Sequence, residues 1–127
     1  MFRAMADDAK TLIEQTVHRF LDEVPALKPM KLVVAVELRG RGDTQHFRLQ
    51  LPDVQVTKDI PDDAQISVEM PRAFFNEMAK DAKVADLREA FMYGQAKASG
   101  PTQYLQLIER VVNKQDERNR QRRAKQH

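Results

Sequence analysis

Residues 64–101 read AQISVEMPRAFFNEMAKDAKVADLREAFMYGQAKASGP. Near the start of this stretch, Ile66, Val68 and Met70 alternate with polar residues. This predicts a half-buried strand, because successive strand side chains point to opposite faces. Pro71 follows, and proline suits the first turn of a helix because an N–H there has no intrahelical partner. The stretch therefore predicts a strand that leads straight into a helix.

Two helices are predicted after this strand. The first spans residues 71–82, and its apolar stripe consists of Phe74, Phe75, Met78, Ala79 and Ala82. The second is short and spans residues 86–92, with Asp86 as its N-terminal cap and Gly94 just beyond its end. Because an amphipathic helix buries its apolar stripe, each helix needs an apolar layer to cover.

A last strand and a last helix complete the predicted fold. Residues 95–99 predict a strand whose inward side chains are only Ala96 and Ala98. A helix over residues 102–112 comes next, with a stripe made of Tyr104, Leu107, Ile108, Val111 and Val112. The stripe ceases there, so any further helix is predicted to run into solvent.

The N-terminal half predicts one helix and an antiparallel hairpin. The expected elements are a helix over residues 7–24 and strands over residues 31–39, 45–51 and 53–58. Asp7 and Asp8 place carboxylates at the start of the helix, where they cap free N–H groups. Residues 40–43 supply the hairpin turn. The first strand is predicted to be the most buried, with one apolar face formed by Leu32, Val34, Val36 and Leu38.

The predicted order is helix, four strands, helix, short helix, strand and helix. This order is typical of an α+β fold in which helices cover the inner face of an antiparallel sheet. The 127 residues suit a single domain over residues 1–112, with residues 113–127 as a C-terminal helix extension or tail. No apolar run approaches the ~20 residues that span a bilayer. The N-terminus MFRAMADDAK does not resemble a secretory signal, so a cytoplasmic protein is expected.

The C-terminal segment is basic, whereas the rest of the chain is acidic. The formal net charge is +2. Residues 113–127 carry +4, from six basic and two acidic side chains, which leaves −2 for residues 1–112. A basic segment of this kind either contacts an anionic surface or is a solvated helix end. The candidates for contact with an anionic membrane are Arg118, Arg120, Arg122, Arg123 and Lys125.

No residue pattern predicts catalysis, a metal site or a cofactor. The chain has no cysteine, which excludes disulfides and thiolate chemistry. His18, His46 and His127 are scattered, at spacings that do not predict a metal site. The four glycines form no phosphate-binding loop, and neither Ser67 nor Ser99 lies in a nucleophile-elbow pattern. We therefore predict a protein that is not an enzyme.

The residues around Gly94 and Gly100 resemble a pattern of the sterol carrier protein type 2 family, the nonspecific lipid-transfer domains. That family combines an alternating strand, a helix with a large apolar pair, and an alanine-phenylalanine pair before a glycine. A second glycine, at the end of the next strand, leads into a C-terminal helix. The matching residues here are Ile66, Val68, Phe74, Phe75, Met78, Ala90, Phe91, Gly94, Gly100, Leu105 and Ile108. The resemblance covers residues 10–112, and it is clearest over residues 64–112.

The resemblance implies a five-stranded, mainly antiparallel sheet whose helices enclose an apolar tunnel. Its ligands would be fatty acyl, sterol-like or isoprenoid lipids. The ligand-binding residues that it implies are Val34, Val36, Phe74, Phe75, Met78, Leu87, Phe91, Met92, Ala96, Ala98, Leu105, Ile108 and Val112. Bulkier aliphatic residues are common in the family at the positions of Ala96 and Ala98. Small residues there either widen the tunnel or let a helix pack closer, so the ligand is expected to differ from those of relatives.

The sequence leaves more than one function open. Non-catalytic transfer of a hydrophobic ligand and its presentation to a partner enzyme both fit the resemblance. The alternative is a nucleic-acid or protein interaction module that uses the basic C-terminal tail. Nucleic-acid binding is disfavoured, because no aromatic residue interleaves the tail and the rest of the chain is net negative. The expected partners are therefore a hydrophobic small molecule or lipid and an anionic membrane surface.

Overall fold

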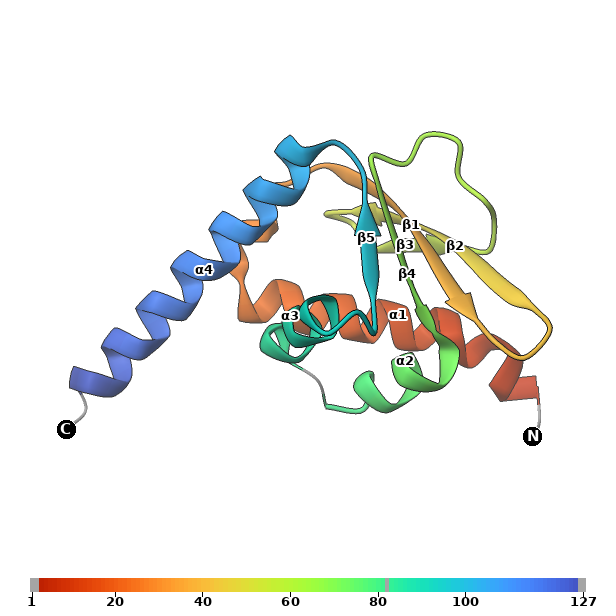
Figure 1. The fold of residues 1–127 in the computed structure, drawn as a ribbon, viewed down its shortest axis with the longest axis horizontal. Coiled ribbons are helices and arrows are strands. Elements are labelled where there is room, and N and C mark those ends of the chain that lie inside the picture. The colour runs from red at the N-terminus through yellow and green to blue at the C-terminus, as the bar shows by residue number, and fades with distance from the viewer. Residues whose placement is uncertain (1–2, 82, 126–127) are drawn as a thin grey trace.

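The computed structural model describes residues 3–81 and 83–125. Figure 1 shows a sheet and helices arranged as an α+β fold. The elements are α1 (Arg3–Glu23), η1 (Pro25–Leu27), β1 (Leu32–Arg39), β2 (Thr44–Leu51), β3 (Gln55–Thr57), β4 (Ile66–Pro71), α2 (Arg72–Met78), α3 (Val84–Met92), β5 (Lys97–Ser99) and α4 (Thr102–Lys125). Their order is the order predicted from the sequence, which confirms the fold class.

The five strands form one sheet in the order β3-β2-β1-β4-β5. β1 and β2 pair antiparallel along their whole length, from Leu32 opposite Leu51 to Arg39 opposite Thr44. The β2–β3 and β4–β5 pairs are also antiparallel, whereas β1 and β4 run parallel. The prediction of a five-stranded, mainly antiparallel sheet is therefore confirmed.

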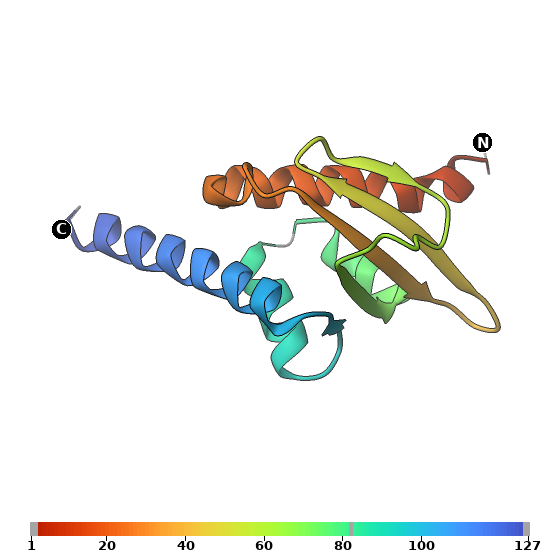
Figure 2. The same ribbon diagram turned by 90° about the horizontal axis from the view of Figure 1, so that it is seen from above.

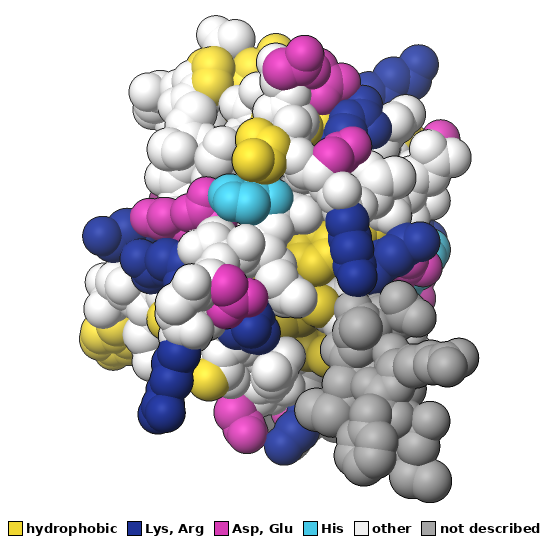
Figure 3. Space-filling model, turned by 90° about the vertical axis from the view of Figure 1, so that its right-hand side faces the viewer, with side chains coloured by type: hydrophobic (Ala, Val, Ile, Leu, Met, Phe, Trp, Pro, Cys, Tyr) yellow, Lys and Arg dark blue, Asp and Glu magenta, His cyan; other side chains and the backbone are white. Residues whose placement is uncertain are grey.

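The alternation in the strands separates an inner face from an outer one. On β1, alternate residues from Leu32 to Leu38 are buried, and the residues between them are only half-buried. On β2, Phe47 and Leu49 are buried, and Arg48 between them lies on the outer face. The main apolar core joins this inner face to α1 and α2. Figure 3 shows that side chains of both charges are interspersed on the end of the molecule that carries the β1–β2 hairpin.

One ion pair on the outer face joins β2 to the loop before β4. The carboxylate of Asp63 accepts hydrogen bonds from Arg48 at 2.7 and 3.1 Å. These hydrogen bonds lower the pKa of Asp63 below its ordinary value and raise the pKa of Arg48. The pair ties the loop to the sheet on the side away from the core.

The N-terminal helix is longer than the sequence predicted. α1 is already helical at Arg3, so the expected start at Asp7 is wrong. Arginine, alanine and methionine are good helix formers, and they fill the residues before Asp7. The helix ends at Glu23, because Pro25 begins the short η1 turn.

The two middle helices differ from the prediction at their ends. α2 stops at Met78, well before the predicted end at Ala82, which lies outside the described residues. α3 begins at Val84, so Asp86 is not its N-cap residue. Asp86 is instead the third residue of the helix, and its carboxylate accepts the backbone N–H of Lys83 at 2.8 Å. The carboxylate of Glu23 accepts the N–H of Val84 at 3.0 Å, which ties the end of α1 to the start of α3.

The two glycines that flank β5 both have backbone conformations that favour glycine. Gly94 follows α3 with a φ of +78°, and Gly100 follows β5 with a φ of +146°. Gly100 also lies against β4, because a Cβ there would be 2.6 Å from the carbonyl oxygen of Gln65. Only glycine allows this close approach of the chain after β5 to the start of β4.

A Gly100→Ala variant is expected to be less stable by about 2–4 kcal/mol, because backbone strain adds to a clash with Gln65. Urea unfolding measures this loss. Gly42→Ala is the matched control, since Gly42 also has a positive φ but has open space around it. Gly42→Ala should be less stable by only about 1–2 kcal/mol, because alanine adopts a left-handed backbone unfavourably. Equal losses in the two variants would contradict the close approach.

The last helix packs only over its first half. Val112 is buried with Val24 and Val84 in a second, smaller core cluster. Arg88 on α3 and Asp116 on α4 form an ion pair at 2.6 Å. Beyond this pair α4 projects away from the sheet (Figures 1 and 2). The helix thus extends to Lys125, beyond residue 112, where its apolar stripe ceases.

None of the helices within residues 3–81 and 83–125 has both the length and the hydropathy needed to cross a membrane.

Candidate functional site

A cavity of about 200 Å³ lies between α1, the inner face of the sheet and the later helices. α1 supplies one wall, and β1, β2 and β4 supply the opposite wall. The remaining lining side chains come from η1 and Met30, from α2, and from single residues on α3 and α4, Leu87 and Ile108. Every lining residue except Thr16 is apolar. A space of this composition suits an apolar molecule.

Six of the predicted ligand-binding residues line this cavity. They are Val34, Val36, Phe75, Met78, Leu87 and Ile108. The two valines reach it because they lie on the inner face of β1. Phe75 and Met78 lie three positions apart on α2 and therefore share one face of that helix.

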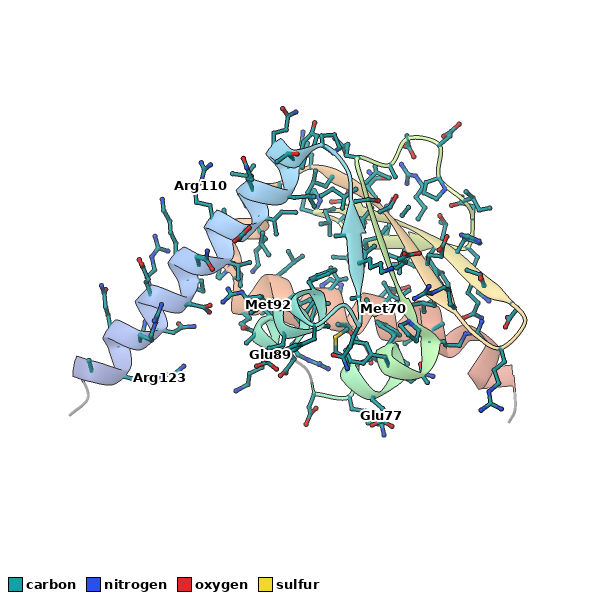
Figure 4. The ribbon with its side chains drawn as sticks, in the orientation of Figure 1. Met70, Glu77, Glu89, Met92, Arg110 and Arg123 are labelled. Atoms are coloured by element: carbon teal, nitrogen blue, oxygen red, sulfur yellow. The ribbon has the colours of Figure 1, made fainter. Side chains whose placement is uncertain are left out.

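Phe74 points elsewhere than Phe75. Adjacent residues on a helix point about 100° apart. Phe74 borders a second, shallow hollow together with Glu77 and Glu89. These two glutamates lie on the side of α2 and α3 that faces away from the sheet (Figure 4). Phe75 thus lines the cavity, whereas Phe74 borders the acidic outer hollow.

Four more predicted residues are buried or half-buried without lining the cavity. Ala96 is buried, and its N–H donates to the carbonyl oxygen of Ala90 at 3.1 Å. Phe91 and Leu105 pack against the main core. Val112 belongs to the smaller cluster. These side chains support the helices around the cavity.

Met92 and Ala98 are exposed. Met92 on α3 is 72% exposed. Ala98 lies opposite Val68 in the β4–β5 register, so both side chains project from the same face of the sheet. Val68 lines the cavity and is half-buried, whereas Ala98 is exposed. Ala98 thus lies on the predicted inward face of β5, but it is exposed there.

The sequence did not predict the contribution of α1. Five of its side chains line the cavity: Ile13, Thr16, Val17, Phe20 and Leu21. They occur at the spacing of one helix face, a pattern that is equally typical of a helix packed on a closed core. The sequence feature that could have indicated a cavity wall on α1 is Thr16, because it is the single polar residue in that apolar stripe.

None of the described residues that line the cavity is charged. Two charged side chains of α1 bind backbone groups between α2 and α3: Arg19 donates to the carbonyl oxygen of Ala79 at 3.2 Å, and Glu23 accepts the N–H of Val84. Across the described ranges 3–81 and 83–125, no three His, Asp or Glu side chains are grouped so that they could hold a metal ion. The arrangement can bury an apolar ligand but offers it no ionic partner.

The proposed membrane-contact residues lie on the projecting half of α4. Arg118, Arg120, Arg122 and Arg123 are all exposed. Their spacing distributes them around the helix, and Arg110 and Arg123 extend from opposite sides of it (Figure 4). The side chain of Lys125 lies outside the described residues.

Comparison with known proteins agrees with this geometry. The model of the SCP-2 sterol transfer family matches residues 11–113. The solution structure of palmitated SCP2L2 from Aedes aegypti is similar, with a TM-score of 0.53 and 17% identity, over 78% of this chain and 93% of that one. The crystal structure of sterol carrier protein 2 like 2 from the same species has a TM-score of 0.52 and 14% identity, over 81% and 98% of the two chains. No curated protein matches the chain.

Proposed function

The chain belongs to the SCP-2 sterol transfer family, and on this premise we propose that it binds an apolar lipid in the cavity between α1 and the sheet. The observation that carries the proposal is the lining, which is apolar except for Thr16. Binding is driven by the removal of apolar ligand surface from water, at about 25 cal/mol per Å². The protein carries or presents the lipid and does not transform it.

An acyl chain is the ligand type that we propose. The similar Aedes aegypti protein was solved in a palmitated form. The cavity here is about 200 Å³, smaller than the roughly 300–1,000 Å³ of typical small-molecule sites. The cavity must therefore widen to hold a long acyl chain. We propose that α3 and α4 move outward, since each contributes a single side chain to the lining.

The entrance is proposed to lie at β5. Ala98 is exposed on the same sheet face as Val68, and Val68 lines the cavity. An acyl chain can enter over this uncovered end of the sheet while its head group stays in water. Carriage from one membrane to another and presentation to an enzyme both require such an opening.

Native mass spectrometry of the protein as purified tests the proposal. We expect a population heavier than the 14.7 kDa chain, and organic extraction should release a lipid that accounts for the difference. A fluorescent fatty acid should also bind to the delipidated protein and be displaced by unlabelled palmitate. A chain that carries no lipid and binds no fluorescent fatty acid would refute lipid binding.

A further inference from the structure

Glu23, the last residue of α1, forms a contact that its own helix does not explain. The C-terminal end of a helix carries partial negative charge, so a carboxylate there is unfavourable for α1. This carboxylate instead reaches the start of another helix, where it accepts the N–H of Val84 at 3.0 Å. The start of α3 carries partial positive charge and has N–H groups without partners inside the helix. The position of Glu23 is therefore favourable for α3 and not for α1.

The helices α3 and α4 are joined to each other close to this contact. Val84 on α3 and Val112 on α4 belong to the same small buried cluster, and Arg88 on α3 pairs with Asp116 on α4 at 2.6 Å. One side chain from each of these helices lines the cavity. The two helices thus form one layer over the cavity, and Glu23 ties the start of that layer to α1.

We infer that Glu23 determines which acyl chain lengths the cavity accepts, because its hydrogen bond to Val84 holds α3 and α4 in the closed position seen in this structure. This inference rests on the proposed function and adds a length selectivity to it. A methylene group fills about the volume of one water molecule, roughly 30 Å³. The closed cavity of about 200 Å³ therefore suits a chain of about seven carbons. A longer chain needs an open position, in which this hydrogen bond is broken.

The hydrogen bond of Glu23 affects long and short chains differently. The apparent affinity for a long chain is reduced in proportion to the fraction of molecules that are open. Loss of the hydrogen bond raises that fraction and raises the affinity for long chains by the same factor. The affinity for octanoate, which fits the closed cavity, does not depend on opening. The affinity for palmitate divided by the affinity for octanoate is therefore the selectivity that Glu23 controls.

Glu23→Ala is expected to raise this selectivity about tenfold, because a hydrogen bond to a carboxylate is lost. Palmitate and octanoate each compete with a fluorescent fatty acid for the delipidated full-length protein. The affinity for palmitate should rise, and the affinity for octanoate should stay as in the wild type. Equal selectivity in the wild type and in Glu23→Ala would overturn the inference. So would an equal change in the affinities for both ligands.

Asp22→Ala is the matched control. Asp22 is the neighbouring carboxylate at the same end of α1, and it pairs with Lys28 at 3.6 Å. Its removal changes the charge at the end of α1 as Glu23→Ala does, but it leaves the hydrogen bond to Val84 in place. Asp22→Ala should therefore have the selectivity of the wild type. A tenfold rise in Asp22→Ala would overturn the inference.

Glu23→Gln is a second, milder variant. Its amide oxygen still accepts an N–H, but the hydrogen bond is weaker than one to a carboxylate. The selectivity should therefore rise only about threefold, to a value between those of the wild type and Glu23→Ala. A larger rise in Glu23→Gln than in Glu23→Ala would overturn the inference.

Amide hydrogen exchange in the wild type, followed by NMR, tests the position of α3 without any substitution. The N–H of Val84 is protected while it donates to Glu23. It should exchange at least about tenfold faster in the palmitate complex than in the octanoate complex. The amides of β1 should exchange equally in the two complexes. Equal protection of Val84 in both complexes would overturn the inference.

The failure of the length selectivity and the failure of lipid binding give different results. If palmitate and octanoate both displace the fluorescent fatty acid and their selectivity does not depend on Glu23, only the role of Glu23 fails. If neither ligand displaces it, the proposed function fails, and the inference fails with it.

Discussion

Phe75→Asp is expected to abolish uptake of a fluorescent fatty acid, whereas Phe74→Asp is expected to leave uptake in place. Phe75 is 4% exposed and lines the cavity. A carboxylate there has no cation beside it, so it either draws water into the cavity or excludes the apolar chain. Phe74 borders the acidic outer hollow instead. Fluorescence titration of both variants measures the effect, and circular dichroism shows that each is folded. A folded Phe75→Asp variant with normal uptake would contradict the site.

Val68→Phe tests the same cavity without removing a buried ring, a loss that costs about 3–5 kcal/mol at Phe75. Val68 is half-buried and lines the cavity, so a larger side chain there fills space that the lipid would use. We expect at least about tenfold weaker binding with no loss of stability in urea. Ile60→Phe, at a position that is 74% exposed, is the control and should bind normally. Unchanged uptake by Val68→Phe would place the lipid elsewhere.

Deletion of residues 118–127 is expected to weaken binding to anionic vesicles strongly. The deletion removes five basic side chains and no acidic one. Each basic side chain near an anionic surface is worth about 1 kcal/mol. If three of the five reach the surface, the affinity falls by about a hundredfold. Co-sedimentation with vesicles that contain phosphatidylserine measures this change at two salt concentrations.

The position of the cut makes this experiment specific. A chain that ends at Glu117 keeps Asp116, and thus keeps the ion pair with Arg88 that joins α4 to α3. It also keeps Ile108, the side chain of α4 that lines the cavity. Uptake of the fluorescent fatty acid should therefore be normal. If the deletion does not change vesicle binding at either salt concentration, the basic end is only a solvated helix.

A mobility-shift assay with the full chain and the chain that ends at Glu117 tests the nucleic-acid alternative. It is run at the same two salt concentrations, because phosphate contacts depend strongly on salt.

The strands were the part of the fold that sequence reasoning predicted best. Their alternation follows directly from the pleat, and the alternate residues of β1 are buried as predicted. Helix ends were predicted less well. α3 begins at Val84, and Glu23, which is distant in the sequence, accepts the N–H of Val84. A cap supplied by another helix leaves no local signal, and the local contact, from the N–H of Lys83 to Asp86, comes from the third helical residue and not from an N-cap side chain.

The candidate site was predicted only in part, for a related reason. Periodicity shows which side of a helix is buried, but it does not show whether that side meets other atoms or open space. Phe91 and Phe75 both lie in apolar stripes, yet only Phe75 lines the cavity. The five lining residues of α1 have the same pattern as a core helix. Ala98 occupies the predicted face of β5 but is exposed there.

The sequence by itself determined the order of the elements, the α+β class and the family pattern. These depend on local properties: the pleat, the helical period, and glycines at Gly94 and Gly100 where the backbone admits little else. Only the tertiary structure decided which apolar side chains enclose a cavity and where the inner face of the sheet stays exposed. Those features depend on how closely elements from distant parts of the chain approach one another, and the periodicity of one segment does not encode that distance.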